Sequence, residues 1–196
     1  DSWQNTGIAT VDGTTYQVFN RNGLDVHLQS GLTGSVEILG STGSDTLQGG
    51  TGSDSIDAGE GDNLVNAGAG NDTVTSGAGA DTIDAGDGSN TVDAGAGDNS
   101  VTTGSGTDSI TAGSGNDSIV AGAGNDTINA GDGTNTVDAG AGNNTVTTGS
   151  GADIVTSGVG SDSITAGAGN DTISAGDGIN TVDAGAGNNT VTTGSG

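Results

Sequence analysis

The sequence has no cysteine, proline or methionine, and its only basic residue besides one histidine is Arg21. The lack of cysteine excludes a disulfide framework and a thiolate metal site. Because 25 acidic residues give a net charge of −24, no basic surface exists for a nucleic-acid backbone or an anionic lipid. No apolar run approaches the roughly 20 residues that a membrane-spanning helix needs. We therefore expect no nucleic acid partner and no membrane insertion.

Hydrophobic residues are also scarce, at 29% of the chain, and Trp3, Tyr16 and Phe19 are the only aromatic residues. Low hydrophobicity combined with a high net charge is typical of disordered chains. This composition therefore indicates that the chain folds only if something other than a large apolar core stabilises it.

Glycine is abundant, with 42 residues, and it recurs in a regular pattern. From Gly49 the chain consists of sixteen nine-residue units without an insertion, followed by a partial unit, TGSG. Each unit has Gly at positions two and four, Asp or Asn at position six, and Ile or Val at position eight. We divide the chain into an N-terminal β cap or junction (1–30), degenerate first repeats (31–48) and regular repeats (49–196). Because the chain stops inside a unit, we expect more repeats, or another copy stacked end to end, to follow.

Each unit combines turn chemistry with a short strand. Gly permits positive φ, and Asp or Asn bonds to nearby backbone in turns. The next three residues are polar, apolar and polar, as in Thr73-Val74-Thr75, which is typical of a strand with one inward side chain. Two units then form one coil of 18 residues, and the apolar residues at position eight point inward from two sheets. The sequence predicts an all-β, parallel β-solenoid.

A longer repeat overlies the short one. AGDG begins units at Ala85, Ala130 and Ala175, which are 45 residues, or five units, apart. Because five is odd, the pattern of Asn units should alternate between the two edges of the solenoid.

Stacked acidic turns repel one another, and the small apolar core cannot offset this repulsion together with the loss of chain entropy. Calcium takes six to eight oxygen ligands with flexible geometry, and Gly-rich turns expose carbonyl oxygens. Mg²⁺ fits less well because it demands tight octahedral geometry, and zinc lacks ligands where His27 is the only histidine. The sequence therefore predicts multiple Ca²⁺ ions bound by the position-six residues.

The units resemble the GGxGxDxUx nonapeptide of the RTX (repeats-in-toxin) family. GGTGSDSID (49–57) matches at every defined position, whereas AGAGNDTV (67–74) and AGSGNDSI (112–119) have Ala in place of the first Gly. The resemblance implies a right-handed parallel β-roll that binds Ca²⁺ between turns, in a protein exported by a type I system. The family's ligands are turn carbonyls and position-six Asp side chains, which here are Asp45, Asp54, Asp72, Asp81, Asp108, Asp117, Asp126, Asp153, Asp162 and Asp171.

Position six departs from the family pattern in seven units, where we expect calcium binding to be weaker or absent. Asn keeps an oxygen ligand without the charge, and it can also stack into amide ladders without a metal. Asp87, Asp132 and Asp177 lie three residues before such an Asn, either as replacement ligands or, as we favour, facing solvent. The seven units have Asn63, Asn90, Asn99, Asn135, Asn144, Asn180 and Asn189 at position six.

Residues 1–30 differ from the repeats. Alternating polar and apolar residues around Asn22-Gly23 predict a hairpin or irregular strands that cap the solenoid. We expect Trp3, Tyr16 and Phe19 to form the core of this cap, with a carbohydrate-stacking site as the alternative. His27 is expected to be an ordinary polar strand residue.

One histidine, no cysteine and no lysine leave few arrangements for a nucleophile and its base, so we expect no enzymatic activity. We predict instead a calcium-dependent structural rod in a secreted or cell-surface protein, such as a surface layer, an adhesin or a matrix filament. Self-association is expected, because acids at position nine would bridge neighbouring rods through calcium. These acids are Asp57, Asp84, Asp93, Asp138 and Asp183.

Two alternatives remain open. The repeats would also suit the export and folding region of a secreted enzyme or toxin. A less favoured alternative is an ice-binding face made of threonine pairs, although aspartates interrupt their rows. The pairs are Thr73/Thr75, Thr145/Thr147 and Thr190/Thr192.

Overall fold

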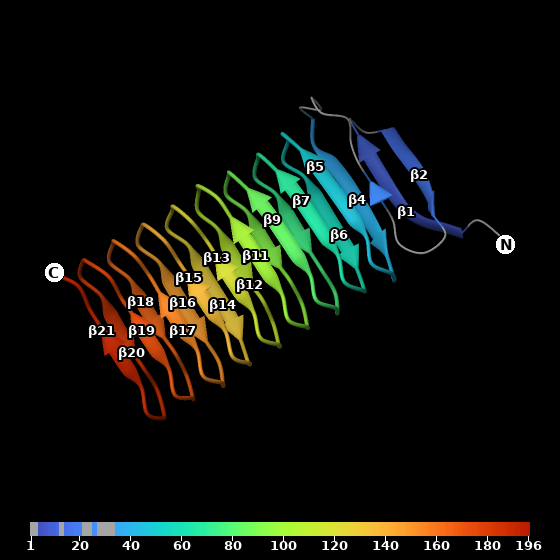
Figure 1. Ribbon diagram of the computed structural model, residues 1–196. Helices are drawn as coiled ribbons and strands as arrows, with labels where there is room; N and C mark the ends of the chain where they lie inside the picture. Colours follow the sequence, from blue (N-terminus) through green and yellow to red (C-terminus); the bar gives the residue numbers. More distant parts are fainter. Residues whose placement is uncertain (1–3, 12–13, 21–24, 27–33) are drawn as a thin grey trace.

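The chain is a two-sheet solenoid in which each coil contributes one strand to each sheet (Figure 1). The computed structural model describes residues 4–11, 14–20, 25–26 and 34–196, with side chains from residue 34 onward. Within these residues every element is a strand, and none forms a helix that could span a membrane. The prediction of an all-β parallel solenoid is confirmed.

One sheet has 11 strands in the order β2-β1-β4-β6-β8-β10-β12-β14-β16-β18-β20. Its strands are β1 (Gln4–Val11), β2 (Thr14–Asn20), β4 (Val36–Ser41), β6 (Ser55–Gly59), β8 (Thr73–Thr75), β10 (Thr91–Asp93), β12 (Ser109–Thr111), β14 (Thr127–Gly131), β16 (Thr145–Thr148), β18 (Ser163–Thr165) and β20 (Thr181–Asp183).

The other sheet has 10 strands and contains the remaining, odd-numbered strands from β3 to β21. They are β3 (Asp25–Val26), β5 (Thr46–Gly50), β7 (Leu64–Gly68), β9 (Thr82–Gly86), β11 (Ser100–Thr103), β13 (Ser118–Val120), β15 (Thr136–Asp138), β17 (Ile154–Thr156), β19 (Thr172–Ser174) and β21 (Thr190–Thr192).

The register of the strands fixes the coil length. In β10 and β12, Val92 pairs with Ile110, and in β11 and β13, Val101 pairs with Ile119. Both pairs are parallel and lie 18 residues apart, so each nine-residue unit stacks on the second unit after it. The backbone bonding continues beyond the strands, as where the Thr91 N–H donates to the Asp72 carbonyl at 2.8 Å.

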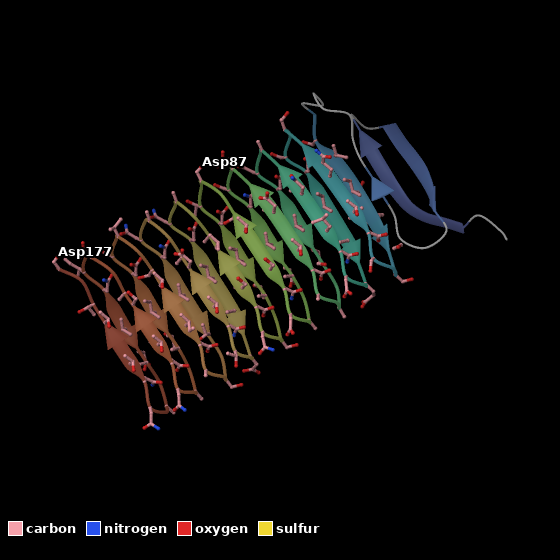
Figure 2. The ribbon with its side chains drawn as sticks, viewed as in Figure 1. Asp87 and Asp177 are labelled. Carbon is pink, nitrogen blue, oxygen red and sulfur yellow. The ribbon has the colours of Figure 1, made fainter. Side chains whose placement is uncertain are left out.

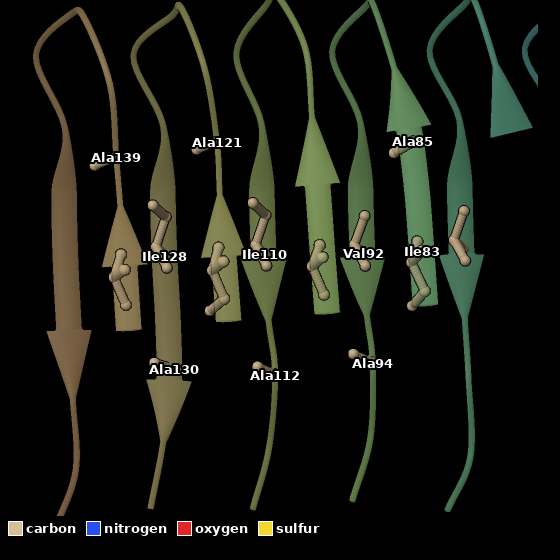
Figure 3. Close-up of a cluster of buried hydrophobic side chains, with 14 of the residues drawn as sticks. Ile83, Ala85, Val92, Ala94, Ile110, Ala112, Ala121, Ile128, Ala130 and Ala139 are labelled. Carbon is tan, nitrogen blue, oxygen red and sulfur yellow. The ribbon is translucent and has the colours of Figure 1, made fainter. Parts of the chain in front are cut away.

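The core lies between the sheets and has two kinds of rows. Position-eight side chains such as Ile83, Val92 and Ile110 are at most 2% exposed, as predicted. The alanines at position one, including Ala85 and Ala94, are also fully buried as far as Ala175, whereas Ala184 in the last unit is partly buried. Figure 3 shows these alanines in rows on either side of the isoleucine and valine rows. The narrow core is therefore filled by one branched and one small side chain from each unit.

Glycine allows the turns to stack closely. Gly88 at position four has a φ of +130°, and a Cβ added there would collide with the carbonyl oxygen of Gly70 in the preceding coil. Gly70 has a φ of +141° and meets Gly52 in the same way. The position-four glycine is thus required by both backbone conformation and space.

The first two strands, β1 and β2, extend the 11-stranded sheet with antiparallel pairing. β1 pairs antiparallel with both β2 and β4, so it covers the sheet edge that β4 would otherwise expose. β3 instead pairs with β5 in the other sheet. Of the two alternatives expected here, a hairpin would place β2 and β3 in one sheet, whereas they lie in different sheets; Asn22 and Gly23 themselves lie outside the described residues.

The side-chain expectations for this region concern Trp3, Tyr16, Phe19 and His27, and all four fall outside the described side chains.

Candidate metal centre

Every position-six residue proposed from the sequence lies in one of two columns, which follow the two long edges of the solenoid. Those from Asp45 to Asp171 are at most 3% exposed, whereas the last Asn of each column is partly buried. The first column, before the 11-stranded sheet, contains Asp54, Asp72, Asn90, Asp108, Asp126, Asn144, Asp162 and Asn180. The second column, before the 10-stranded sheet, contains Asp45, Asn63, Asp81, Asn99, Asp117, Asn135, Asp153, Asp171 and Asn189.

Asp and Asn share one structural role in these columns. From Asp54 onward, the Oδ1 atom of each column residue accepts a hydrogen bond from the backbone N–H of the residue 18 positions earlier. The Asp54 N–H donates to Asp72 Oδ1 at 2.8 Å, and the Asp72 N–H donates to Asn90 Oδ1 at 3.0 Å. At the start of the first column the Val36 N–H donates to Asp54 Oδ1 at 2.8 Å. Either residue type therefore joins one coil to the next.

The second side-chain atom distinguishes the two residue types. In Asn90, Nδ2 donates to the carbonyl oxygens of Gly86 and Gly88 at 2.9 and 3.2 Å. Asn135 bonds to Gly131 and Gly133 in the same way. The Nδ2 atoms of all seven Asn residues have at least one backbone carbonyl as acceptor. We call each position-six residue a rung of its column. The side-chain amide of an Asn rung therefore finds its hydrogen-bond acceptors in its own turn.

At most Asp rungs the corresponding oxygen has no partner. A carboxylate oxygen cannot donate to the carbonyls that an Asn amide would reach, and eight Oδ2 atoms are buried without a hydrogen bond. Such a group requires either a hydroxyl donor or a cation. The eight residues are Asp54, Asp72, Asp81, Asp108, Asp117, Asp126, Asp153 and Asp171.

Two Asp rungs have hydroxyl partners instead. Ser157 Oγ lies 2.8 Å from Asp162 Oδ2 and 2.9 Å from the Ala175 carbonyl oxygen, and Ser41 Oγ lies 3.0 Å from both carboxylate oxygens of Asp45. Ser76 occupies the same position relative to Asp81 as Ser157 does to Asp162, but its hydroxyl is buried without a partner. A serine at the right position thus satisfies the carboxylate only where its hydroxyl turns toward it.

Burial disfavours the charged form of these carboxyls. Burial raises the pKa of Asp54 to about 6, against the lowering effect of the Val36 N–H, and the charge of Asp72 raises it further. Burial likewise raises the pKa of Asp72, Asp117 and Asp126. An unpaired buried charge costs several kcal/mol. The columns therefore favour a positive charge beside them.

The donor set fits calcium. Nowhere among the described residues do three acidic side chains converge, so a cation would need turn carbonyls as well as one or two carboxylates. By the equivalence of the repeats, the carbonyls beside Asp72 belong to Gly68 and Gly70, which correspond to Gly86 and Gly88 of the Asn90 turn. Calcium accepts such mixed oxygen ligands in variable geometry.

The acids at position three lie on the outside, as we favoured. Asp87 is exposed, and its Oδ1 accepts hydrogen bonds from Ser105 N at 2.9 Å and Ser105 Oγ at 2.7 Å. These bonds lower its pKa, as bonds from the next coil do for Asp132 and Asp177. Figure 2 shows Asp87 and Asp177 on the same long edge of the solenoid. They hold neighbouring turns together from outside rather than replacing a column carboxylate.

The acids at position nine are also exposed, and each has a local role. Asp57 Oδ1 accepts the Gly59 N–H at 3.2 Å, and Asp93 Oδ1 accepts the Gly95 N–H at 3.3 Å. Asp84, Asp138 and Asp183 make the same bond at the start of their turns. One oxygen of each carboxylate is thus used within its own turn.

Sequence reasoning missed two features of this centre. Position one is buried, and at Thr103 and Thr148 its hydroxyl donates to the carbonyls of Ala121 and Ala166, each at 2.7 Å. Position six links coils through Oδ1 in both its Asp and its Asn form. The invariant Asp or Asn at position six was the available signal, because both residues offer that one acceptor.

Comparison with known families gives eight overlapping matches to the RTX calcium-binding nonapeptide repeat (4 copies), which together span residues 39–196. A comparison with curated proteins gives no match. The matched segments are 39–74, 66–101, 75–110, 102–137, 111–146, 129–164, 147–182 and 165–196.

Proposed function

Because the chain belongs to the RTX calcium-binding nonapeptide repeat family, we propose that it is a calcium-dependent structural rod of a secreted or cell-surface protein. Its repeats bind several Ca²⁺ ions, and the β-roll that they form is a structural fold rather than a catalytic one. What the ions do for this chain follows from the two columns of position-six residues.

The ligands in this proposal are the carboxylates of the Asp rungs together with turn carbonyls. The observation that carries it is the set of eight buried Oδ2 atoms without a hydrogen-bond partner. A cation beside them would neutralise their charge and bond to oxygens that nothing else satisfies.

Calcium binding is coupled to folding in this proposal. The position-six side chains are brought together only by the stacking of coils 18 residues apart, so the unfolded chain has no preformed site. Ligands that form only in the native state add their binding free energy to its stability. A metal-free chain would have to bury eight unsatisfied carboxylate oxygens instead.

A structural role is supported by the uniformity of the outer surface. In the coils of residues 49–196, positions three, five, seven and nine face outward and carry mainly small polar or acidic residues. Such a surface suits lateral contacts repeated along a rod better than one unique binding site. Members of this family are typically secreted into the extracellular space, where calcium is plentiful. Acids at position nine, such as Asp57 and Asp93, would supply their free oxygens to ions shared with a neighbouring rod.

The test is far-UV circular dichroism during a Ca²⁺ titration of residues 1–196, with light scattering in parallel and reversal by EGTA. We expect a disordered spectrum without calcium, a β-rich spectrum with it, and increased scattering at or above the folding step. A β-rich spectrum that EGTA does not change would contradict coupled folding.

Scattering separates the rod from the export-region alternative. Calcium-dependent folding without any association would remove the support for an assembling rod and favour a folding region of a secreted enzyme or toxin. A parallel Mg²⁺ titration is the control for ionic strength, and we expect it to produce little folding.

A further inference from the structure

The order of Asp and Asn along each column is uneven. In the first column two Asp pairs, Asp54/Asp72 and Asp108/Asp126, are each followed by an Asn rung. In the second column Asp153 and Asp171 form the only pair, and the other Asp rungs are adjacent to Asn rungs. The chain thus has three places where two carboxylates are adjacent in successive coils.

The members of a pair act on each other. The Asp54 N–H donates to Asp72 Oδ1 at 2.8 Å, and the Asp108 N–H donates to Asp126 Oδ1 at 2.9 Å. In both pairs the second oxygen of each residue is buried without a partner. Two charged carboxylates held this close in successive coils repel each other. One divalent ion would neutralise both.

An Asn rung is closed to a cation by its own amide. Asn90 Nδ2, a hydrogen-bond donor, lies 2.9 Å from the Gly86 carbonyl and 3.2 Å from the Gly88 carbonyl. A cation at that place would have to displace the amide and would gain no negative charge in return. The rung keeps its link to the next coil, because the Asn90 N–H donates to Asp108 Oδ1 at 2.7 Å.

The remaining Asp rungs are of two kinds. Asp45 and Asp162 already accept hydroxyl hydrogen bonds, from Ser41 and Ser157. Asp81 and Asp117 have an unpartnered buried oxygen, but both neighbours in their column are Asn. Each of these two offers a cation one carboxylate instead of two, and ligand charge is a main determinant of calcium affinity.

We propose that calcium loads this rod unevenly, with one tightly held ion at each of the three Asp pairs, and that the Asn rungs are metal-free links in which the side-chain amide takes the place of the ion. The single carboxylates Asp81 and Asp117 bind an ion roughly tenfold or more weakly. The inference rests on the proposed calcium-dependent folding, and it adds which turns carry the metal.

The test counts ions per chain by equilibrium dialysis at free calcium concentrations from roughly micromolar to millimolar, with circular dichroism to verify folding. The wild-type chain should bind three ions in its tight class, one for each Asp pair. Asn90→Asp joins the two pairs of the first column into one run of acidic rungs and creates two new adjacent pairs. We therefore expect that variant to gain two ions.

Asp126→Asn breaks one pair and should lose one tight ion. The matched control is Glu37→Gln, which removes the same charge from an exposed site on β4 and should leave the count unchanged.

Other outcomes would overturn the inference. If each unpartnered carboxylate held its own ion, Asn90→Asp would gain only one. If every turn held an ion whatever its residue, Asn90→Asp would gain none and Asp126→Asn would lose none. Calcium-induced folding with either of these counts would refute the uneven loading alone, whereas no calcium uptake at all would refute the proposed function as well.

Discussion

Two neighbouring turns of the first column, those of Asp72 and Asn90, have the same backbone but differ in whether the second polar atom of the side chain has a hydrogen-bond partner. Both side chains are buried, and both accept an N–H from the preceding coil through Oδ1. The Asn90 amide then donates to two carbonyls of its own turn, whereas Asp72 Oδ2 has no partner. The comparison teaches that position six links the coils in both forms, and that only the acidic form leaves a buried oxygen without a partner.

A proton should partly replace the cation at the Asp rungs, and this gives the largest expected effect. Burial raises the pKa of Asp54 from 3.8 to about 6, so protonation favours the folded state. The stabilisation is complete below the ordinary pKa and is lost as pH rises through the raised value. In EGTA, lowering the pH from neutral to about 4 should therefore increase β-structure measured by circular dichroism.

The outer acids provide an internal control for that pH dependence. Hydrogen bonds from Ser105 and Ser150 lower the pKa of Asp87 and Asp132. Their contribution is present above the ordinary pKa of 3.8 and is lost only as pH falls below it. A metal-free chain that lost structure between pH 6 and pH 4 would contradict the role given to the buried carboxyls.

Because both kinds of turn share one backbone, replacing the position-four glycine should destabilise each of them equally. Gly88→Ala in the Asn90 turn and Gly70→Ala in the Asp72 turn both add a Cβ that collides with a carbonyl of the preceding coil. We expect each to lower the free energy of unfolding in saturating calcium by about 2–6 kcal/mol, measured by urea denaturation. Ala96→Ser, at an exposed position three, should change it by less than about 0.5 kcal/mol. A large effect at Gly70 alone would show that the two turns do not share their packing.

Removing one carboxylate should change the stability of the chain in opposite directions at a single Asp rung and at an Asp pair. Asp117→Asn replaces an orphaned oxygen between two Asn rungs with a donor, and should stabilise the chain at low calcium by about 1–3 kcal/mol. Asp126→Asn removes half of a pair and should destabilise the chain at saturating calcium. The measurement is the free energy of unfolding by urea at low and at saturating calcium, and a loss at saturating calcium as large for Asp117→Asn as for Asp126→Asn would contradict the difference between the rungs.

The smallest effect is expected at a rung that has a hydroxyl donor. Ser157→Ala removes the donor 2.8 Å from Asp162 Oδ2 and leaves that carboxylate like the eight orphaned ones. The loss should be about 1 kcal/mol in urea denaturation. Ser163→Ala, on the exposed face of β18, is the matched control and should have little effect.

The period of the sequence was sufficient to predict most of the fold. Ile or Val at position eight of every unit gave the inward rows, and the exact spacing gave coils of 18 residues. The five-unit block also predicted that equivalent Asn residues alternate between edges, and Asn90 and Asn135, 45 residues apart, do lie in different columns. Position one was not predicted to be buried, because Ala beside Gly in a turn carries no periodic apolar signal of its own.

The pairing of the N-terminal strands depends on long-range contacts that the local sequence pattern does not contain. Asn22-Gly23 has strong local turn chemistry, but β2 pairs with β1 and β3 pairs with β5. The position-six residues were predicted as metal ligands from their carboxylate and amide oxygens. The bonds of the Asn90 amide nitrogen to the carbonyls of Gly86 and Gly88 could be recognised only in the structure.

The most direct test of the difference between Asp and Asn rungs is the circular dichroism spectrum, in EGTA at neutral pH, of a chain in which all eight orphaned aspartates are changed to asparagine. We expect this variant to keep its β-rich spectrum without calcium, whereas the wild-type chain loses it. A variant that is as disordered in EGTA as the wild type would contradict the claim that unsatisfied buried carboxylates are what make the fold depend on calcium.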